Sequence, residues 1–190
     1  MLGIDALAPT TGQQVLDIGC GTGLNFSLLQ QRVGTSGAIV GIDRSAEMLH
    51  QARRRAQARG WNNVILLQAD MVLLDPGTIA ARIQESGGAA ASDAALATYS
   101  LSLMGDWQQA WTNMNRLLSA DARIGVVDMQ DPVGWARWFT PLARLACAAG
   151  GSDITAAPWQ AVEERCVDVM RASARGGHLQ IRAGKRTDNE

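Results

Sequence analysis

Residues 15–23, VLDIGCGTG, combine one carboxylate, Asp17, with three glycines spaced two residues apart. Glycine lets the backbone approach a ligand closely, and the free N–H groups that open a following helix can bind an anionic group. A dinucleotide fingerprint would need its third glycine at Leu24, and the stretch also lacks the Lys and the Ser or Thr of a P-loop. The pattern therefore disfavours a phosphate ligand, and Asp17 indicates a cation in the same pocket.

A ligand with an ammonium group, a carboxylate, a ribose and an adenine, but no phosphate, satisfies these features. S-adenosylmethionine is such a ligand. Each acid also has a simpler interpretation: Asp17 as a strand-end acid, Asp43 as a charge at a helix N-terminus and Asp70 as a turn former. Because ligands of open α/β sheets bind at the carboxyl ends of the strands, three acids that end three successive strands favour one shared site.

A shared site for these three acids requires parallel strands that are connected by helices. Short runs rich in Val, Ile and Leu predict strands buried on both faces of a parallel sheet. The runs are residues 13–19, 38–43, 63–70, 94–102 and 123–129. Residues 87–92, GGAAAS, predict a loop into the fourth strand. The order predicts an α/β fold with a doubly wound, mostly parallel, Rossmann-like sheet.

Two helical patterns separate the first three strands. The first opens with Leu24, Leu28 and Leu29 and ends at Gly34. The second is capped by Ser45 and ends at Gly60. Its predicted buried face comprises Met48, Leu49, Ala52 and Ala56.

The pattern changes after residue 129. We expect a helix over residues 133–149, another near residues 159–165, and a closing antiparallel hairpin. Its strands, residues 167–174 and 178–184, flank the turn Arg175-Gly176-Gly177. We therefore expect residues 1–190 to form one domain, with a cofactor-binding core at 14–129 and substrate-side helices and the hairpin at 130–190.

Composition limits the class of function. The chain has 17 basic and 18 acidic residues, so no global charge attracts nucleic acid or anionic lipid. Its three cysteines form no CxxC pair, which argues against a disulfide framework and a zinc site, and we expect no bound metal. The N-terminus has no basic region followed by an apolar run, so we expect a cytoplasmic protein without a leader or membrane span.

The motifs resemble those of the class I S-adenosylmethionine-dependent methyltransferases, from about residue 15 to residue 129. LDIGCGTG resembles the first family motif, VGIDRSAEML the second and LLQAD the third. Asp43 follows Gly23 by 20 residues, the spacing expected of an acid that binds ribose hydroxyls. The stretch into the fifth strand departs from the family, because Ala120-Asp121-Ala122 replaces the usual proline and paired glycines.

The resemblance implies a set of residues that bind the cofactor. Met48 would lay its thioether against the adenine, Asp70 would accept from the adenine amino group, and the Met71 N–H would reach the ring. The implied set is Asp17, Gly19, Cys20, Gly21, Gly23, Asp43, Arg44, Met48, Asp70, Met71 and Thr98.

The acceptor side is less defined by the sequence. Methyl transfer from a sulfonium mainly needs positioning and a free lone pair, and a base helps only some acceptors. The catalytic candidates are Tyr99, Asp128 and His178, with Ser100, Ser102, Asp106 and Asp131 on the same loops. Tyr99 is equally well explained as a strand residue with its hydroxyl hydrogen-bonded, whereas the pattern favours a hairpin residue over a base for His178.

The fourth motif, ATYSLS, is not the Asn/Asp-Pro-Pro-aromatic form of enzymes that methylate amide or exocyclic nitrogens, so we do not expect a nucleic-acid substrate. Two small-molecule resemblances remain: ubiquinone/menaquinone-biosynthesis C-methyltransferases, and bacterial phospholipid and betaine-lipid N-methyltransferases. Both imply acceptors with apolar tails, such as a lipid head-group amine or a quinone-like ring.

An aromatic stripe after the fifth strand is relevant to an acceptor with an apolar tail. Trp135, Trp138, Phe139, Leu142 and Leu145 fall on one helical face. The stripe favours a helix that covers the sheet over one that lies on a membrane surface.

Few residues precede the first strand, so we also consider an open pocket, a second copy of the chain that closes it, or a start further upstream. The alternative to an enzyme is a module that binds S-adenosylmethionine without transferring methyl.

Overall fold

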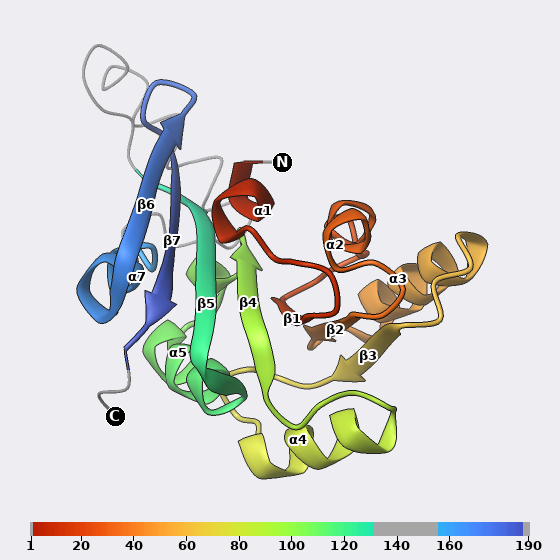
Figure 1. Ribbon diagram of the computed structural model, residues 1–190. Helices are drawn as coiled ribbons and strands as arrows, with labels where there is room; N and C mark the ends of the chain where they lie inside the picture. The colour runs from red at the N-terminus through yellow and green to blue at the C-terminus, as the bar shows by residue number, and fades with distance from the viewer. Residues whose placement is uncertain (1, 131–155, 188–190) are drawn as a thin grey trace.

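The computed structural model describes residues 2–130 and 156–187, and these residues form seven strands and seven helical segments around one sheet (Figure 1). The predicted helix at 133–149, its aromatic stripe and Asp131 lie outside the described residues. The elements are α1 Leu2–Leu7, β1 Gln14–Ile18, α2 Phe26–Val33, β2 Ala38–Asp43, α3 Ala46–Ala58, β3 Val64–Gln68, α4 Pro76–Glu85, β4 Ser92–Thr98, η1 Leu101–Leu103, α5 Trp107–Arg116, β5 Leu118–Met129, α7 Gln160–Arg165, β6 Cys166–Ala174 and β7 Leu179–Arg186.

The sheet confirms the predicted fold class. Its strand order is β3-β2-β1-β4-β5-β7-β6. The first five strands pair in parallel, whereas β7 pairs antiparallel with both β5 and β6. The order therefore reverses between β1 and β4, and a ligand site is expected at the carboxyl ends of the strands on either side of that reversal.

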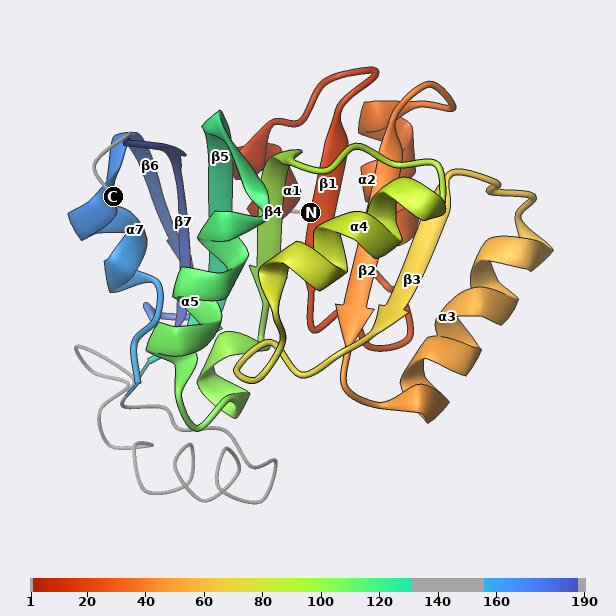
Figure 2. The same cartoon turned by 90° about the horizontal axis from the view of Figure 1, so that it is seen from below.

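Helices cover both faces of the sheet (Figure 2). Val15 and Ile39 pack with α1, α2 and α3, whereas their neighbours Leu16 and Val40 pack with α4, α5 and α7. Successive strand residues face opposite sides, and both sides are covered. This is why the strands read as continuous apolar runs.

Several predicted boundaries were wrong. The first helix begins at Phe26, and Leu24 lies in the preceding turn with 72% of its surface exposed. Met48 is 43% exposed instead of sharing the buried face of α3. The fourth run ends as a strand at Thr98 and continues into η1.

Strand β5 begins at Leu118, five residues before the predicted start. A shift in the β4–β5 register lies between Ser92 and Ala94, whose partners are Leu118 and Arg123. Ser119 and Asp121 interrupt the apolar pattern at this point, and for that reason the start of the strand was not predicted. The N-cap of α3 was predicted correctly, since Ser45 Oγ accepts from Met48 N at 3.3 Å.

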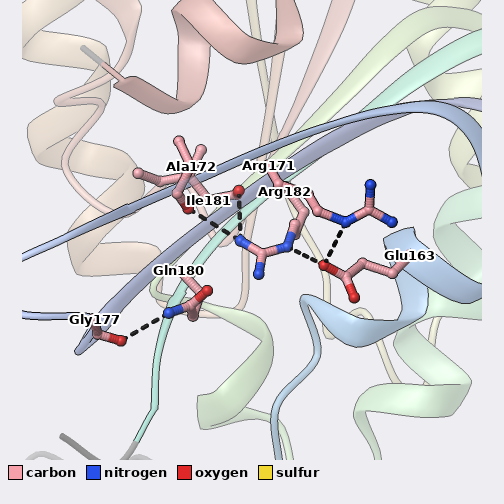
Figure 3. A network of polar contacts seen from close by, with 7 residues as sticks. All are labelled: Glu163, Arg171, Ala172, Gly177, Gln180, Ile181 and Arg182. Atoms are coloured by element: carbon pink, nitrogen blue, oxygen red, sulfur yellow. Dashed lines mark hydrogen bonds and ion pairs between the residues drawn. The ribbon is translucent and has the colours of Figure 1, made fainter. Parts of the chain in front are cut away.

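The closing hairpin and the helix before it are confirmed. Glu163 on α7 accepts hydrogen bonds from Arg171 of β6 and Arg182 of β7 (Figure 3). The Arg182 guanidinium also lies 4.8 Å from the centre of the Trp159 ring. This network fastens α7 to the hairpin, and the antiparallel pairing of β7 with β5 holds the hairpin at the edge of the parallel strands.

Candidate functional site

A cavity of about 310 Å³ lies at the carboxyl ends of the parallel strands and contains most of the predicted cofactor residues. Of the described residues, its lining comprises Gly19, Gly21, Ile42, Asp43, Arg44, Met48, Ala69, Asp70, Met71, Val72, Tyr99, Ser100, Leu103, Met104 and Gly105. The volume is at the lower end of the usual range for small-molecule sites.

The glycine loop after β1 is held against the end of β2. Gly19 N and Cys20 N donate to Ile42 O at 2.8 and 3.1 Å. Gly21 N donates to Asp43 Oδ2 at 2.8 Å, and Arg55 Nε of α3 donates to Thr22 O at 2.9 Å. Because its polar groups are paired with neighbouring elements, the loop is a fixed wall of the cavity.

Gly19 and Gly21 are required for different reasons. Both have a left-handed backbone, with φ of 64° and 53°. A Cβ on Gly19 would lie 2.5 Å from the Cβ of Ser100, whereas a Cβ on Gly21 would meet no atom within 4 Å. Gly19 therefore permits β1 and β4 to approach each other, and Gly21 leaves space at the cavity.

This difference predicts that alanine at Gly19 mainly lowers stability, whereas alanine at Gly21 mainly weakens cofactor binding. Gly19→Ala should lower the free energy of unfolding by about 2–4 kcal/mol, because overpacking adds to backbone strain. Gly21→Ala should cost only about 1 kcal/mol of stability, but should weaken cofactor binding. Urea denaturation and calorimetric titration with S-adenosylhomocysteine measure the two effects. A Gly21→Ala protein that binds as tightly as the wild type would contradict this assignment.

Asp43 ends β2 at the cavity and already orders the surrounding backbone. Its Oδ2 accepts from Gly21 N and its Oδ1 accepts from Ser45 N, both at 2.8 Å. A carboxylate has about four lone-pair sites. Each oxygen therefore keeps capacity for a further donor, such as a ribose hydroxyl.

Asp70, Met71 and Met48 line the same cavity. Asp70 Oδ1 accepts from Val72 N at 2.9 Å, which closes a turn after β3. The amide of Asn113 on α5 donates to Met71 O at 2.9 Å and to Val72 O at 3.2 Å. This buried amide fixes the turn, so that Asp70 is presented to the cavity by a rigid segment.

Asp17 lies behind the wall of the first cavity and is not part of its lining. The residue is fully buried, and its Oδ1 accepts from Asn25 Nδ2 at 3.0 Å. Its Oδ2 has no hydrogen-bond partner among the described residues. Burial raises the Asp17 pKa to about 7, against a weaker lowering by the Asn25 hydrogen bond and a small further rise from Asp43. A buried carboxylate oxygen without a partner is costly unless a donor or a proton satisfies it.

Cys20 and Gly23 belong to the loop but do not line the cavity. Burial raises the pKa of the Cys20 thiol far above its ordinary value, so the thiol stays protonated. Both residues contribute to the shape of the loop.

Tyr99 lies between this cavity and a second one. The second cavity measures about 330 Å³, and Tyr99 lines both. Tyr99 has a left-handed backbone with φ of 53°, held by its N–H, which donates to Val127 O at 2.8 Å. Non-glycine residues in this conformation are often found at functional sites. Thr98, predicted to bind the cofactor, lines the second cavity only.

Asp128 and His178 are not among the described residues that line either cavity. Asp128 is buried at the end of β5, where its carboxylate accepts from Ser102 Oγ at 2.7 Å and Ser102 N at 3.2 Å. Burial raises the Asp128 pKa, and these hydrogen bonds partly oppose the rise. The His178 ring makes a short contact with Gln130 O, and the residue closes the hairpin turn.

Several residues that line the two cavities are not predicted by the sequence motifs. Leu103, Met104 and Gly105 line the first cavity, and Asn25 and Arg175 line the second. The rule that ligands bind beyond the carboxyl ends of strands would have found the first group. No sequence motif near Arg175 identifies it as a site residue. Arg175 lines the same cavity as Thr98 and Tyr99 only because β7 pairs with β5.

The site fits the predicted cofactor by its own chemistry. Two carboxylates at the cavity can accept from hydroxyl and amino groups, and the open space at Gly21 admits close backbone approach. A thioether, Met48, lines the wall. The unpartnered oxygen of Asp17 suits a nearby cationic group.

Comparison with known proteins agrees with this description. Residues 9–153 match a family model described as a methyltransferase domain. The chain is 30% identical over 135 residues to nocamycin O-methyltransferase of Saccharothrix syringae, covering 71% of this chain and 44% of that protein. It is 40% identical over 67 residues to aklanonic acid methyltransferase of Streptomyces sp. strain C5, covering 35% of this chain and 30% of that protein. The chain therefore spans less than half the length of both relatives.

Solved structures share the fold. A SAM-dependent methyltransferase from Aquifex aeolicus superimposes with a TM-score of 0.67 at 15% identity, covering 97% of this chain and 87% of that one. Geranyl diphosphate C-methyltransferase from Streptomyces coelicolor, solved with S-adenosyl-L-homocysteine, gives 0.68 at 15% identity, covering 98% and 74%. In the part of this chain that the structure describes, no helix has the length and apolar character needed to cross a membrane.

Proposed function

Since the chain belongs to the class I S-adenosylmethionine-dependent methyltransferase family, we propose that it methylates a small, mostly apolar molecule. The observation that carries this proposal is the pair of cavities that meet at Tyr99. The first has the carboxylates and glycine backbone suited to the cofactor. The second has mainly apolar walls beside it.

The cofactor supplies a methyl group already activated on a sulfonium, so the protein mainly has to position the acceptor and exclude water. Asp43 would hold the ribose hydroxyls, and Met48 and Asp70 would select the adenine. Tyr99, which lines both cavities, would orient the acceptor.

Acceptors of this class include a lipid head-group amine or a quinone-like ring. The names of the two relatives, which refer to aklanonic acid and nocamycin, also support a small-molecule acceptor. The near balance of charge gives no support to a nucleic-acid substrate.

The alternative is a module that binds the cofactor without turnover, and one experiment separates the two. The protein is incubated with methyl-labelled S-adenosylmethionine and a cell extract, and the extract is then separated into organic-soluble, protein and nucleic-acid fractions. We expect label in the organic-soluble fraction and formation of S-adenosylhomocysteine, and at a subsaturating cofactor concentration we expect much less of both with Asp43→Ala. Stoichiometric cofactor binding without S-adenosylhomocysteine formation would favour the binding module.

A further inference from the structure

The described lining of the second cavity is mainly apolar. Its apolar side chains come from α1, β5 and the hairpin: Leu2, Ile4, Val127, Ala174, Leu179 and Ile181. Asn25, Thr98 and Tyr99 add polar groups beside the first cavity, and Arg175 is the single charged side chain of the described lining.

Within residues 2–130 and 156–187, the Arg175 guanidinium makes no contact that stabilises the fold. Arg175 makes no side-chain hydrogen bond or ion pair with any residue in 2–130 or 156–187. Its neighbours on the hairpin differ, because Arg171 and Arg182 both pair with Glu163 (Figure 3). Arg175 is exposed at this cavity, and its guanidinium, which has no side-chain partner among the described residues, is free to pair with a ligand.

The turn that carries Arg175 is anchored to the sheet. Gly177 O accepts from the side-chain amides of Gln130 and Gln180, at 2.8 and 2.7 Å. Figure 3 shows the Gln180 contact. Gln130 N donates to His178 O at 2.9 Å, which ties the turn to the end of β5. Arg175 itself has a left-handed backbone with φ of 54°. The Cα of Arg175 is therefore held at the cavity by the surrounding contacts.

A guanidinium binds carboxylate and phosphate groups through paired, charge-assisted hydrogen bonds, which are stronger than those between neutral groups. A neutral apolar molecule would gain nothing from Arg175. An apolar molecule with an anionic group would fill the apolar wall and pair with the cation.

We propose that the acceptor is an apolar molecule with an anionic group, carboxylate or phosphate, and that Arg175 binds this group in the second cavity. The proposal rests on the proposed function, because it names the substrate class of the same site. Arg175 is a specificity-determining residue in this scheme and takes no part in methyl transfer.

Two matched fluorescent probes test this proposal on the full chain. 8-Anilinonaphthalene-1-sulfonate is an apolar anion, and N-phenyl-1-naphthylamine is its uncharged parent. Both are titrated in the presence of saturating S-adenosylhomocysteine, so that the first cavity is filled. The variants are Arg175→Gln, Arg175→Lys and a control, Arg82→Gln, at an exposed position on α4.

We expect Arg175→Gln to weaken binding of the sulfonate about tenfold and to leave binding of the neutral probe unchanged. Arg175→Lys should keep only part of the affinity, because the ammonium retains the charge but not the paired donors of the guanidinium, and Arg82→Gln should behave as the wild type. Leu2→Glu places an anion at an exposed residue of the cavity, and it should also weaken binding of the sulfonate probe.

Equal sulfonate affinity in the wild type and Arg175→Gln would overturn the proposal, as would an equal loss for both probes. A separate titration with S-adenosylhomocysteine tests the proposed function independently. If the wild type does not bind it, the methyltransferase assignment fails, whereas unchanged binding in Arg175→Gln leaves only the acceptor class at issue.

Discussion

Asp17→Asn should make the ligand-free protein more stable at pH 8 and should leave its stability near pH 4 almost unchanged. Burial raises the Asp17 pKa from 3.8 to about 7. The folded state therefore retains a proton that the unfolded chain loses, and stability falls as the pH rises from 4 through 7. Over that range the loss reaches about 4 kcal/mol, and an asparagine does not incur it.

Urea denaturation of both proteins across this pH range measures the effect. The Asn25 hydrogen bond survives in the variant, because an asparagine oxygen can accept it. Parallel pH profiles for the two proteins would show that Asp17 titrates at its ordinary value, and would remove the argument for a cation beside it.

The same carboxylate predicts how cofactor binding depends on pH. If the charge of Asp17, from behind the cavity surface, stabilises the ammonium of S-adenosylmethionine, affinity should rise between about pH 5.5 and 7 as Asp17 ionises, and should fall once the ligand amine loses its proton near 8. Asp17→Asn should remove the rise. 5′-Methylthioadenosine, which lacks the amino-acid portion, is the control, and its binding should be the same in both proteins. If the affinity for 5′-methylthioadenosine also rises over this pH range, the group that titrates is not Asp17 acting on the ammonium.

Asp43→Ala should weaken binding of S-adenosylmethionine by about 1.5–3 kcal/mol, the scale of hydrogen bonds to a charged group. The loss has two sources. The ribose loses its acceptor, and the Gly21 N–H loses the oxygen that holds the glycine loop in place. Calorimetric titration measures the change directly.

Two comparisons isolate the ribose contribution. Removing the 2′-hydroxyl from 5′-methylthioadenosine should weaken its binding to the wild type but not to Asp43→Ala. Asp75→Ala, which removes the N-cap of α4, should lower stability by about 1 kcal/mol and leave cofactor affinity unchanged. Wild-type affinity in Asp43→Ala would remove this acid from the site.

The sequence alone was sufficient to predict the strands β1 to β3, the glycine loop and the two acids that line the first cavity. These features depend on local patterns. A parallel strand, a crossover helix and the next parallel strand bring successive carboxyl ends to one edge of the sheet. Asp43 and Asp70 therefore had to lie close together. Burial on both faces made each strand a continuous apolar run that could be recognised.

Other features were set by contacts between segments distant in the sequence. Whether Asp17 faces the ligand or lies behind Asn25 depends on how α2 packs on β1, and no periodicity records it. The start of β5 was hidden because Ser119 and Asp121 interrupt its apolar pattern and its first residues pair with β4 through an irregular register.

The second cavity is the clearest case, because it joins residues 2–4, 98–99 and 174–181. Helix α1 packs on β7 and β5, and the antiparallel hairpin returns Arg175 to the end of β4. Patterns of hydrophobicity report which face of an element is buried but not which distant element covers it. Only the tertiary structure therefore determined the walls of the second cavity and its one positive charge.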